Sequence, residues 1–380
     1  MSSRKTTFPL ALITALAITG LWVALCSSFA VEVGDFPAFY TGAVLAHQGH
    51  YASLHDTAEQ IRAQAQFLSV ARVPVYFVRP HVYAAFLSPL GYLSLKEAFA
   101  VWVGVQAAIW CGIGLWARRR FGNDALILMG LFPPVILAVG FGQDPAIFLG
   151  LAVLSFIFYE RGWLLAAGVA LGCAFIKPHL LLLFPVVLLV QRRWRMLAGF
   201  ALAGAAEALL SLVLGGFEGA RVYLQFLREQ EAHLTPEPQR MVNLQGLLVN
   251  LGLDYSALRW ALIALVAVGV ARIAMRGSWW QAMAAALAGS ALVAPHVFMY
   301  DTTLLVLPAL LMFFQGATRR ARIAATVFFT PLPYLVQLAG IPWTIAPGLV
   351  VLGLMSMLFL DGVTLPEAEL TLTAPPRPAA

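Results

Sequence analysis

Charged side chains are scarce in this chain of 380 residues. Asp, Glu, Lys and Arg together make up 11% of it, whereas 61% of the residues are hydrophobic and the mean hydropathy is +0.83. Because soluble domains ordinarily contain about 25% charged residues, this composition excludes a water-soluble globule. It indicates an integral membrane protein, in which every charged group near the bilayer needs a physical explanation.

The sequence also lacks the motifs of several large enzyme classes. It has no Walker-type glycine loop, no HExxH, no paired CxxC and no GxSxG, which argues against an ATP-driven pump and against a soluble sugar-nucleotide site. Cys26, Cys111 and Cys173 lie inside apolar segments without metal-type spacing, so they indicate packing rather than a disulfide framework. No cofactor or metal-ligand cluster is predicted, and a metal requirement stays open.

Apolar segments of membrane-spanning length recur along the chain. Runs such as LLLLFPVVLLV and ALIALVAVGVA are continuously apolar, whereas the strands of a β-barrel would alternate, so we predict an all-α polytopic fold. Several segments are shorter than the roughly 20 residues that cross a bilayer, so tilted or re-entrant pieces are expected. The predicted helices, about twelve in all, lie at residues 8–30, 95–117, 124–141, 143–159, 162–176, 178–191, 195–214, 256–273, 279–295, 300–314, 321–338 and 341–360.

The basic residues indicate how these helices are oriented. The formal net charge is +6, but the basic side chains fall in short loops rather than along one face, which favours a topology signal over nucleic-acid binding. With an uncleaved first helix, the pattern predicts an inner-membrane protein with both termini in the cytoplasm. The basic groups on the cytoplasmic side are Arg4, Lys5, Arg118, Arg119, Arg120, Arg161, the QRRWR segment, Arg272, Arg276, Arg319, Arg320 and Arg322.

Two long loops fall on the extracytoplasmic side, at residues 31–94 and 215–255. In the first loop, the helical spacing of Phe36, Phe39 and Tyr40 predicts an amphipathic helix that lies flat on the membrane. The segment RPHVYAAFLSPLGYLS is apolar and punctuated by proline, which is typical of a re-entrant piece. The predicted membrane domain covers residues 1–362, and a polar, proline-rich cytoplasmic tail covers 363–380.

Asp35 is the first candidate for a catalytic residue, because it directly follows the first apolar span in the segment VGDFPAFY. Gly34 before it and Pro37 after it also fit a helix N-cap with an early proline, so a structural role stays open. A carboxylate at the edge of a cavity can instead act as a general base.

Lys177 interrupts a long apolar stretch in FIKPHLLL, at a cost of about 2.5–3.5 kcal/mol on insertion scales. A phosphate-bearing lipid would offset this cost, and so would extension of the side chain to ordinary headgroups. Arg79 and His81, in YFVRPHVY, offer a second cationic contact on the same side, unless Arg79 only anchors the re-entrant piece.

Further polar residues mark turns on that side. Gln143 and Asp144, in GFGQDPAIF, form a turn in which Asp144 fits an N-cap before a proline. His296, Tyr300 and Asp301 have i, i+4 and i+5 spacing, which would gather them at a helix start where Asp301 also fits a cap.

In order and spacing, these segments resemble glycosyltransferase family 87, a group of polytopic enzymes of the GT-C type. The resemblance implies a membrane glycosyltransferase that takes a hexose or pentose from a polyprenyl-phosphate donor. It also implies transfer, with inversion, to a glycolipid or polysaccharide acceptor outside the cytoplasm. The segments that carry the resemblance are GDFPAFYTGAVLAHQGHYASLHD, RPHVYAAFLSPLGYLSLKEAFAVW, GQDPAIFLGLAVL, LLAAGVALGCAFIKPHLLLLFPVVLLVQRRWR and APHVFMYDTTLLVLPAL.

The resemblance also implies roles for individual residues. By its position in the first extracytoplasmic loop, Asp35 matches the general base. Lys177, with Arg79, would stabilise the phosphate of the donor. The residues implied to line the cavity for donor and acceptor are Tyr40, His81, Gln143, His179, His296, Tyr300 and Asp301.

A transporter or lipid flippase is the alternative, because Asp35, Lys177 and Asp301 would also suit a pathway across a helix bundle. The sequence favours the enzyme, since these groups gather on one face and no two-fold repeat is evident. A scaffold of the same family without activity stays open as a third possibility.

Overall fold

The computed structural model describes residues 34–364, apart from 70–73, 131, 234–237, 317, 336–341 and 343. The predicted helix at 8–30 and the predicted tail beyond Thr364 lie outside the described residues. The described elements are α3 (Phe36–His47), α4 (Thr57–Phe67), α5 (His81–Leu87), η1 (Ser88–Tyr92), α6 (Leu95–Phe121), α7 (Asp124–Gly130), α8 (Pro133–Phe141), α9 (Pro145–Glu160), α10 (Leu164–Gly172), η2 (Cys173–Ile176), η3 (Pro178–Leu181), α11 (Phe184–Val190), α12 (Trp194–His233), η4 (Pro238–Arg240), α13 (Leu244–Asn250), α14 (Ser256–Arg276), α15 (Trp279–Val293), η5 (Met299–Leu305), α16 (Val306–Gln315), α17 (Arg319–Phe329), α18 (Leu332–Leu335) and α19 (Ile345–Thr364).

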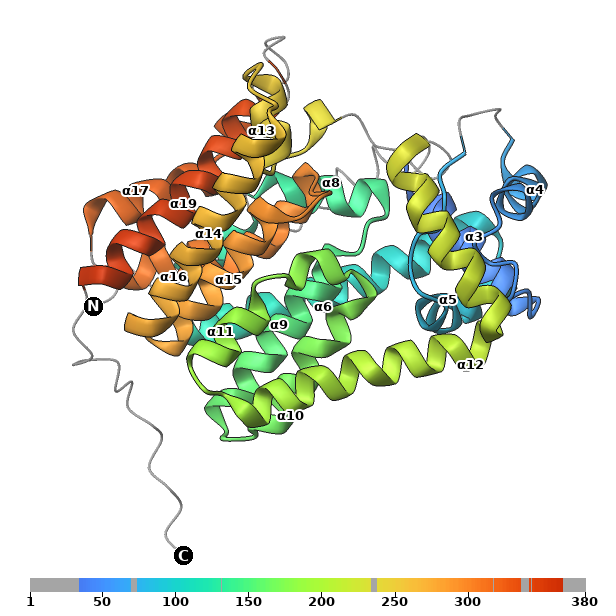
Figure 1. Cartoon of the computed structure of the whole chain (residues 1–380), viewed down its shortest axis with the longest axis horizontal. Coiled ribbons are helices and arrows are strands. Elements are labelled where there is room, and N and C mark those ends of the chain that lie inside the picture. Colours follow the sequence, from blue (N-terminus) through green and yellow to red (C-terminus); the bar gives the residue numbers. More distant parts are fainter. Residues whose placement is uncertain are drawn as a thin grey trace, which may run out of the picture.

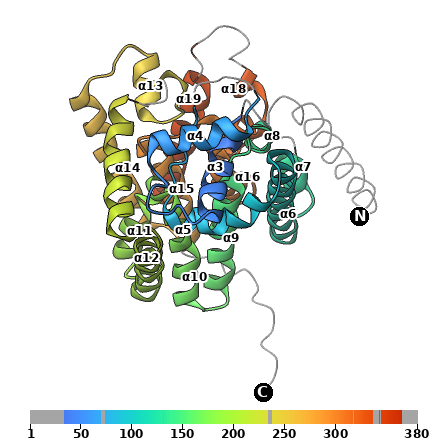
Figure 2. The same cartoon turned by 90° about the vertical axis from the view of Figure 1, so that its right-hand side faces the viewer.

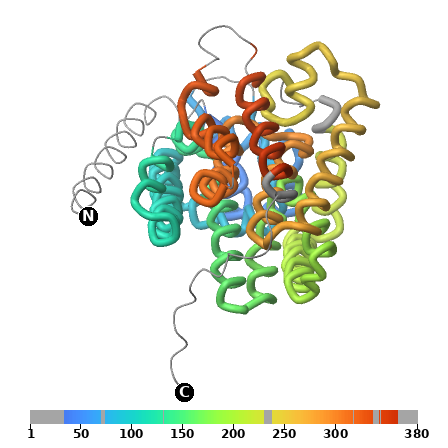
Figure 3. The backbone as a smooth tube through the Cα atoms, turned by 90° about the vertical axis from the view of Figure 1, so that its left-hand side faces the viewer, coloured from blue at the N-terminus to red at the C-terminus, as the bar shows by residue number. Residues whose placement is uncertain are grey.

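The described residues are helical or irregular, which confirms the predicted all-α fold for that part of the chain. The C-terminal helices α14 to α19 form one side of the molecule, α3 to α5 form the other, and α9 to α11 lie between them (Figure 1). Figure 2 shows α3, α4 and α5 facing the viewer, and Figure 3 shows the orange and red C-terminal helices from the opposite side.

Among the described residues, α6, α14 and the Trp194–Glu229 part of α12 are long and apolar enough to cross a membrane. α7 and α8 together pass the same test, but they are bent by 49° relative to each other. The shorter apolar helical stretches of 10–17 residues, some of which join an α-helix to a 3₁₀ turn, are Pro145–Glu160, Leu164–Ile176, Pro178–Val190, Trp279–Val293, Met299–Gln315 and Ile345–Leu360. The prediction of about twelve spans is therefore not confirmed. Prolines such as Pro133 and Pro178 begin new helices inside stretches that are continuous by composition alone.

The first long loop is folded rather than spread over the membrane surface. Every residue of α3 except Val44 and His47 is buried, so the prediction of an amphipathic helix is wrong for this segment, and its orientation relative to the membrane stays a prediction. Its apolar spacing reflects burial on several sides, against α5, η1 and α6. α4, in contrast, is a surface helix, and the Asp56 carboxylate caps it by accepting hydrogen bonds from two backbone N–H groups at 2.8 and 3.0 Å.

α12 joins the membrane-spanning part of the fold to this loop. It bends at Gly216, whose φ of 65° is a conformation that favours glycine, and the second part turns back toward α3 (Figure 1). There the Tyr223 hydroxyl donates to the carbonyl of Val78 at 3.3 Å. Much of the predicted second loop, 215–255, is therefore helical: α12 extends into it and α13 follows.

The end of that second loop is fixed to the segment before η5. The Val242 N–H donates to the carbonyl of Val297 at 2.8 Å, and the buried Asn243 amide donates to the carbonyl of Ala294 at 2.6 Å. Asn243 also caps α13 by accepting from the N–H of Gly246 at 2.9 Å. These bonds hold η4 beside the chain that leads to His296.

The contact between α10 and α12 depends on glycine. A Cβ atom on Gly168 would lie 2.0 Å from the carbonyl oxygen of Met196, so the two backbones touch. We expect Gly168→Ala to force the helices apart and to lower the free energy of unfolding by about 1–3 kcal/mol. The measurement is thermal unfolding in detergent, with Gly104→Ala as the control, because a Cβ on Gly104 of α6 meets nothing within 4 Å. Equal unfolding temperatures for the two variants would contradict the close contact.

Candidate functional site

A cavity of about 900 Å³ lies between the first long loop, the break before η3 and the chain that enters η5. Its wall is mostly apolar, with several charged and polar side chains from segments far apart in the sequence. The residues that line it are Asp35, Ala38, Phe39, Val75, Tyr76, Phe77, Val78, Arg79, Leu137, Phe141, Gln143, Ile176, Lys177, Pro178, His179, Tyr223, Leu227, Arg240, Pro295, His296, Phe298, Met299, Tyr300 and Asp301.

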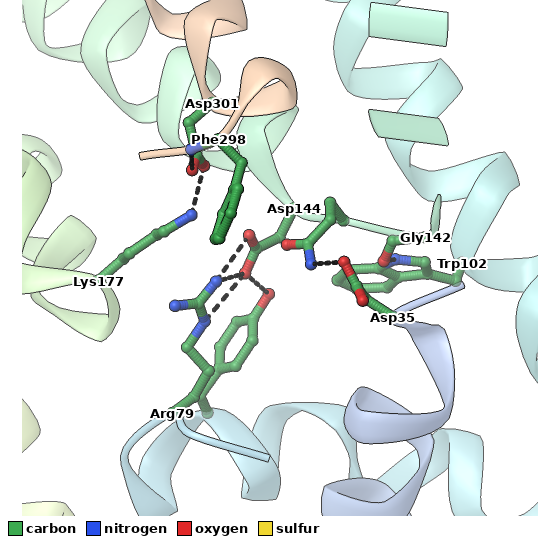
Figure 4. A network of polar contacts seen from close by, with 10 residues as sticks. Asp35, Arg79, Trp102, Gly142, Asp144, Lys177, Phe298 and Asp301 are labelled. Atoms are coloured by element: carbon green, nitrogen blue, oxygen red, sulfur yellow. Dashed lines mark hydrogen bonds and ion pairs between the residues drawn. The ribbon is translucent and has the colours of Figure 1, made fainter. Parts of the chain in front are cut away.

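Asp35 occupies the N-cap position of α3, but its side chain makes no capping hydrogen bond. Instead its Oδ2 accepts a hydrogen bond of 2.7 Å from Nε2 of Gln143 (Figure 4). The backbone N–H of Asp35 donates to the carbonyl of Phe141 at 2.9 Å, which joins the start of α3 to the end of α8. The carboxylate is therefore held at the cavity wall by an amide from another element.

The turn that presents Gln143 depends on Gly142, which has a φ of 70°. A Cβ atom there would lie 2.6 Å from Cβ of Phe36, so both the backbone conformation and the close approach require glycine. The indole N–H of the buried Trp102 donates to the carbonyl of Gly142 at 2.8 Å. α6 thus holds the turn, and the turn holds Asp35.

Arg79 and Asp144 form a buried ion pair in the middle of the site (Figure 4). The guanidinium donates to both carboxylate oxygens, with the two Nη2 contacts at 3.0 Å, and the Tyr83 hydroxyl donates to Oδ2 at 3.2 Å. Burial, together with the Asp144 charge, raises the pKa of Tyr83 well above its ordinary value, so this hydroxyl remains a donor. Asp144 occupies the N-cap position of α9, but its side chain does not cap that helix.

His55 fixes the backbone of Arg79. Its Nε2 lies 2.8 Å from the Arg79 carbonyl oxygen, and because a carbonyl only accepts, Nε2 carries the proton. Burial and the neighbouring His81 lower the pKa of His55 to about 3, so the ring is neutral near pH 7. The ring also packs on Tyr223 of α12, with 4.2 Å between centroids.

Lys177 and Asp301 form a second buried ion pair (Figure 4). Lys177 occupies the break between η2 and η3, and its ammonium lies 5.9 Å from the ring centre of Phe148 and 5.8 Å from that of Tyr300. Oδ1 of Asp301 contacts the ammonium, while Oδ2 accepts from the N–H of Phe298 at 3.0 Å. Asp301 therefore does cap the start of η5, and it also neutralises Lys177.

Two histidines and a tyrosine complete the polar wall. His179 and His296 face each other edge to face, with ring centroids 6.4 Å apart. Nε2 of His179 is buried and has no hydrogen-bond partner among the described residues. Tyr300 packs on Phe298 and is close enough to Asp35 and Asp301 to interact with both charges.

The other two residues expected in the cavity do not line it. Tyr40 is buried in α3, and its hydroxyl donates to the carbonyl of Leu93 at 2.6 Å. His81 packs against α12, where a Cβ on Gly215 would lie 2.6 Å from its Nε2. Both side chains support the first loop instead of facing the site.

Three contributions to the site are not predicted by the sequence. The sequence places Asp144 at a turn without naming its partner, although a carboxylate next to an apolar helix has to find a cation. Tyr223 and Arg240 come from the second long loop, in which no candidate residue is predicted. Nothing in the sequence indicates that these two residues line the cavity, because they reach it through the bend at Gly216 and the hydrogen bond of Val242.

No three His, Cys, Asp or Glu side chains within the described parts of the chain form a group that could hold a metal ion. The polar chemistry of the cavity therefore comes from one carboxylate held by an amide, from two ion pairs and from a pair of histidines. Asp35 lies on one side of the Arg79–Asp144 pair and Lys177 on the other (Figure 4).

Removal of one member of the central ion pair should destabilise the protein strongly. Asp144→Asn leaves the Arg79 guanidinium buried without a counter-charge, so we expect a loss of about 3–5 kcal/mol in the free energy of unfolding. Asp254→Asn is the control, because that carboxylate is half exposed and lies 3.8 Å from Arg259. Chemical unfolding in detergent micelles measures both, and a similar small effect in the two variants would refute the structural role of the pair.

The neutral state of His55 predicts a dependence of stability on pH. Its pKa is lower in the folded state than the ordinary value near 6.5, so the unfolded chain takes up a proton first and stability falls as the pH drops from about 6.5 toward 3. The expected slope from this group is at most about 1.4 kcal/mol per pH unit. His55→Gln should reduce the slope of unfolding temperature against pH between 7.5 and 5.5. His50→Gln, at an exposed histidine, should leave it unchanged.

Comparison with known proteins identifies the family. No curated protein and no solved structure matches the chain. The model of glycosyltransferase family 87 matches residues 77–308, which is more than half of the chain and includes the two ion pairs, Gln143 and the histidine pair, although Asp35 precedes it. The chain therefore belongs to glycosyltransferase family 87, and it is a membrane glycosyltransferase.

Proposed function

We propose that the chain transfers a sugar from a polyprenyl-phosphate donor to a hydroxyl group of a glycolipid or polysaccharide, with inversion at the anomeric carbon. The reaction takes place at the extracytoplasmic face of the inner membrane, and Asp35 is the general base. The observation that carries this proposal is the composition of the cavity wall, where the Asp35 carboxylate, the Arg79 guanidinium and the Lys177–Asp301 pair face the same space.

In the proposed reaction, Asp35 accepts the proton of the acceptor hydroxyl as its oxygen attacks the anomeric carbon. The bond between that carbon and the phosphate oxygen breaks, and its electron pair leaves with the polyprenyl phosphate. Gln143 supports this role, because its amide holds Oδ2 of Asp35 at 2.7 Å and so fixes the orientation of the carboxylate. An oriented base within hydrogen-bond reach contributes about 10²–10⁴-fold to a rate.

Lys177 and Arg79 support the choice of a phosphate leaving group. Both cations are buried in the cavity wall, where charge interactions are stronger than in water, and charge develops on the leaving phosphate in the transition state. Asp144 holds Arg79 through Nε and Nη2, so the contribution of Arg79 is a fixed positive field near the reacting atoms. Lys177 has a flexible side chain and is the better candidate for direct contact.

The size and polarity of the cavity agree with two substrates. Ligand pockets generally have volumes of about 300–1,000 Å³, and this cavity of about 900 Å³ is at the upper end of that range. Its polar groups are few, and apolar side chains such as Leu137, Phe141 and Leu227 form much of the wall. A sugar phosphate next to the polar groups and an isoprenoid chain along the apolar wall suit this distribution.

The test is transfer by purified protein in liposomes, with polyprenyl-phosphate sugars as donors and lipid extracts as acceptors. We expect Asp35→Asn to lower the transfer rate by about 10²–10⁴-fold, because the amide cannot accept the proton, while the unfolding temperature stays close to that of the wild type. Asp124→Asn is the matched control, since this carboxylate is exposed at the start of α7.

Equal transfer by the wild type and Asp35→Asn would show that another group is the base. If neither protein transferred sugar, and labelled lipid instead moved between the leaflets, the function would be transport. A single liposome preparation reports on both outcomes.

A further inference from the structure

Lys177 is unusual for a proposed phosphate-binding lysine, because it already forms an ion pair with the acid Asp301. Both side chains line the cavity, and both are almost fully buried, with 6% and 1% of their side-chain surfaces exposed. A phosphate that enters the cavity must therefore share Lys177 with Asp301 or displace it.

Asp301 is held so that it can release Lys177 without losing its position. Its two oxygens have separate partners: Oδ1 contacts the ammonium and Oδ2 accepts from the backbone N–H of Phe298 at 3.0 Å. If the ammonium moves to a phosphate, the second bond still keeps the carboxylate in the wall. Asp301 then remains close to the bound phosphate as a like charge, which is unfavourable in a buried site.

This repulsion differs between the proposed donor and the proposed product. The donor is a phosphate diester with one negative charge. When the bond to the anomeric carbon breaks, the leaving group becomes a phosphate monoester, which carries about −1.5 to −2 near pH 7. The attraction of the product to Lys177 and Arg79 grows with this charge, and so does its repulsion by Asp301.

We infer that Asp301 is a built-in competitor for the lipid phosphate at Lys177, and that it weakens binding of the polyprenyl-phosphate product so that this product leaves. The inference rests on the proposed function for the chemical class of its ligand. It assigns to Asp301 a role opposite to that of an ordinary binding residue, since its removal should strengthen binding. The other charged or titratable groups around the pair are Arg79, His179, His296 and Tyr300.

The experiment measures binding of farnesyl phosphate to the purified full chain in detergent, with farnesol as the probe that lacks the phosphate. Asp301→Asn keeps the shape of the side chain, and its amide oxygen still accepts from the N–H of Phe298. We expect the dissociation constant for farnesyl phosphate to fall about 10-fold, which corresponds to about 1.4 kcal/mol, and the constant for farnesol to stay the same. Lys177→Met should lose the phosphate-dependent part of the affinity.

Thermal unfolding provides a second measurement. Asp301→Asn leaves Lys177 buried without a counter-charge, so the empty variant should unfold at a lower temperature and gain more from farnesyl phosphate than the wild type does. Should this variant not fold, a second uncharged variant replaces it. Asp301→Ser is used in that case, because it also removes the charge and leaves a small polar side chain, and binding should again be tighter than in the wild type.

The outcomes separate the inference from the proposed function. If the wild type prefers farnesyl phosphate over farnesol, and the folded Asp301 variants bind it no more tightly, Asp301 is not a competitor and only the inference is overturned. If the wild type binds the two probes alike, phosphate is not recognised. The proposed donor class and the inference then both fail.

Discussion

Arg79 and Asp144 carry opposite charges into the interior of the protein, where 8% and 0% of their side-chain surfaces are exposed, and the rest of the site is arranged around their contact. Neither charge is tolerable there alone, because the desolvation of an unpaired ion costs several kcal/mol. The pair joins the segment before α5 to the start of α9. It therefore fixes the first long loop against the helices that follow, and with that loop it fixes Asp35.

The second buried ion pair, Lys177–Asp301, is held by fewer contacts than the first. Arg79 is held at several points, because Nε and Nη2 donate to both carboxylate oxygens of Asp144 and His55 bonds its backbone carbonyl. Lys177 has a single point contact, and its partner Asp301 has an alternative hydrogen bond. The Arg79–Asp144 pair connects two parts of the fold. The Lys177–Asp301 pair lines the cavity, and in the inference above it exchanges partners when a phosphate binds.

The sequence predicts the class of fold and most residues of the site, for a simple physical reason. Polar residues in an apolar chain are conspicuous, so Asp35, Gln143 and Lys177 stand out by their chemistry alone, and the cavity contains them. Which group pairs with which is not predictable in this way. The sequence leaves a lipid phosphate and ordinary headgroups open as partners of Lys177. It does not predict the pairing with Asp301, because this pairing depends on how η3 and η5 approach each other in space.

Errors in the fold prediction have a similar origin. The spacing of Phe36 and Phe39 is compatible with a helix that is apolar on one face, and only the packing of α5 and α6 shows that α3 is buried on several sides. Tyr40 and His81 are close in sequence to site residues, but helix geometry turns them away from the cavity. The prediction of about twelve spans is based on composition, and composition alone does not indicate where a proline divides one apolar run into two helices.

The bend of α12 at Gly216 connects an apolar helix to the wall of the cavity. The stretch Trp194–Glu229 is long and apolar enough to cross a membrane, and within it the part after the bend contributes Tyr223 and Leu227 to the cavity wall. A helix in a bilayer adjusts its tilt to the thickness of the hydrocarbon layer. Because one helix contains both a candidate span and two residues of the cavity wall, a change in its tilt would move that wall as well.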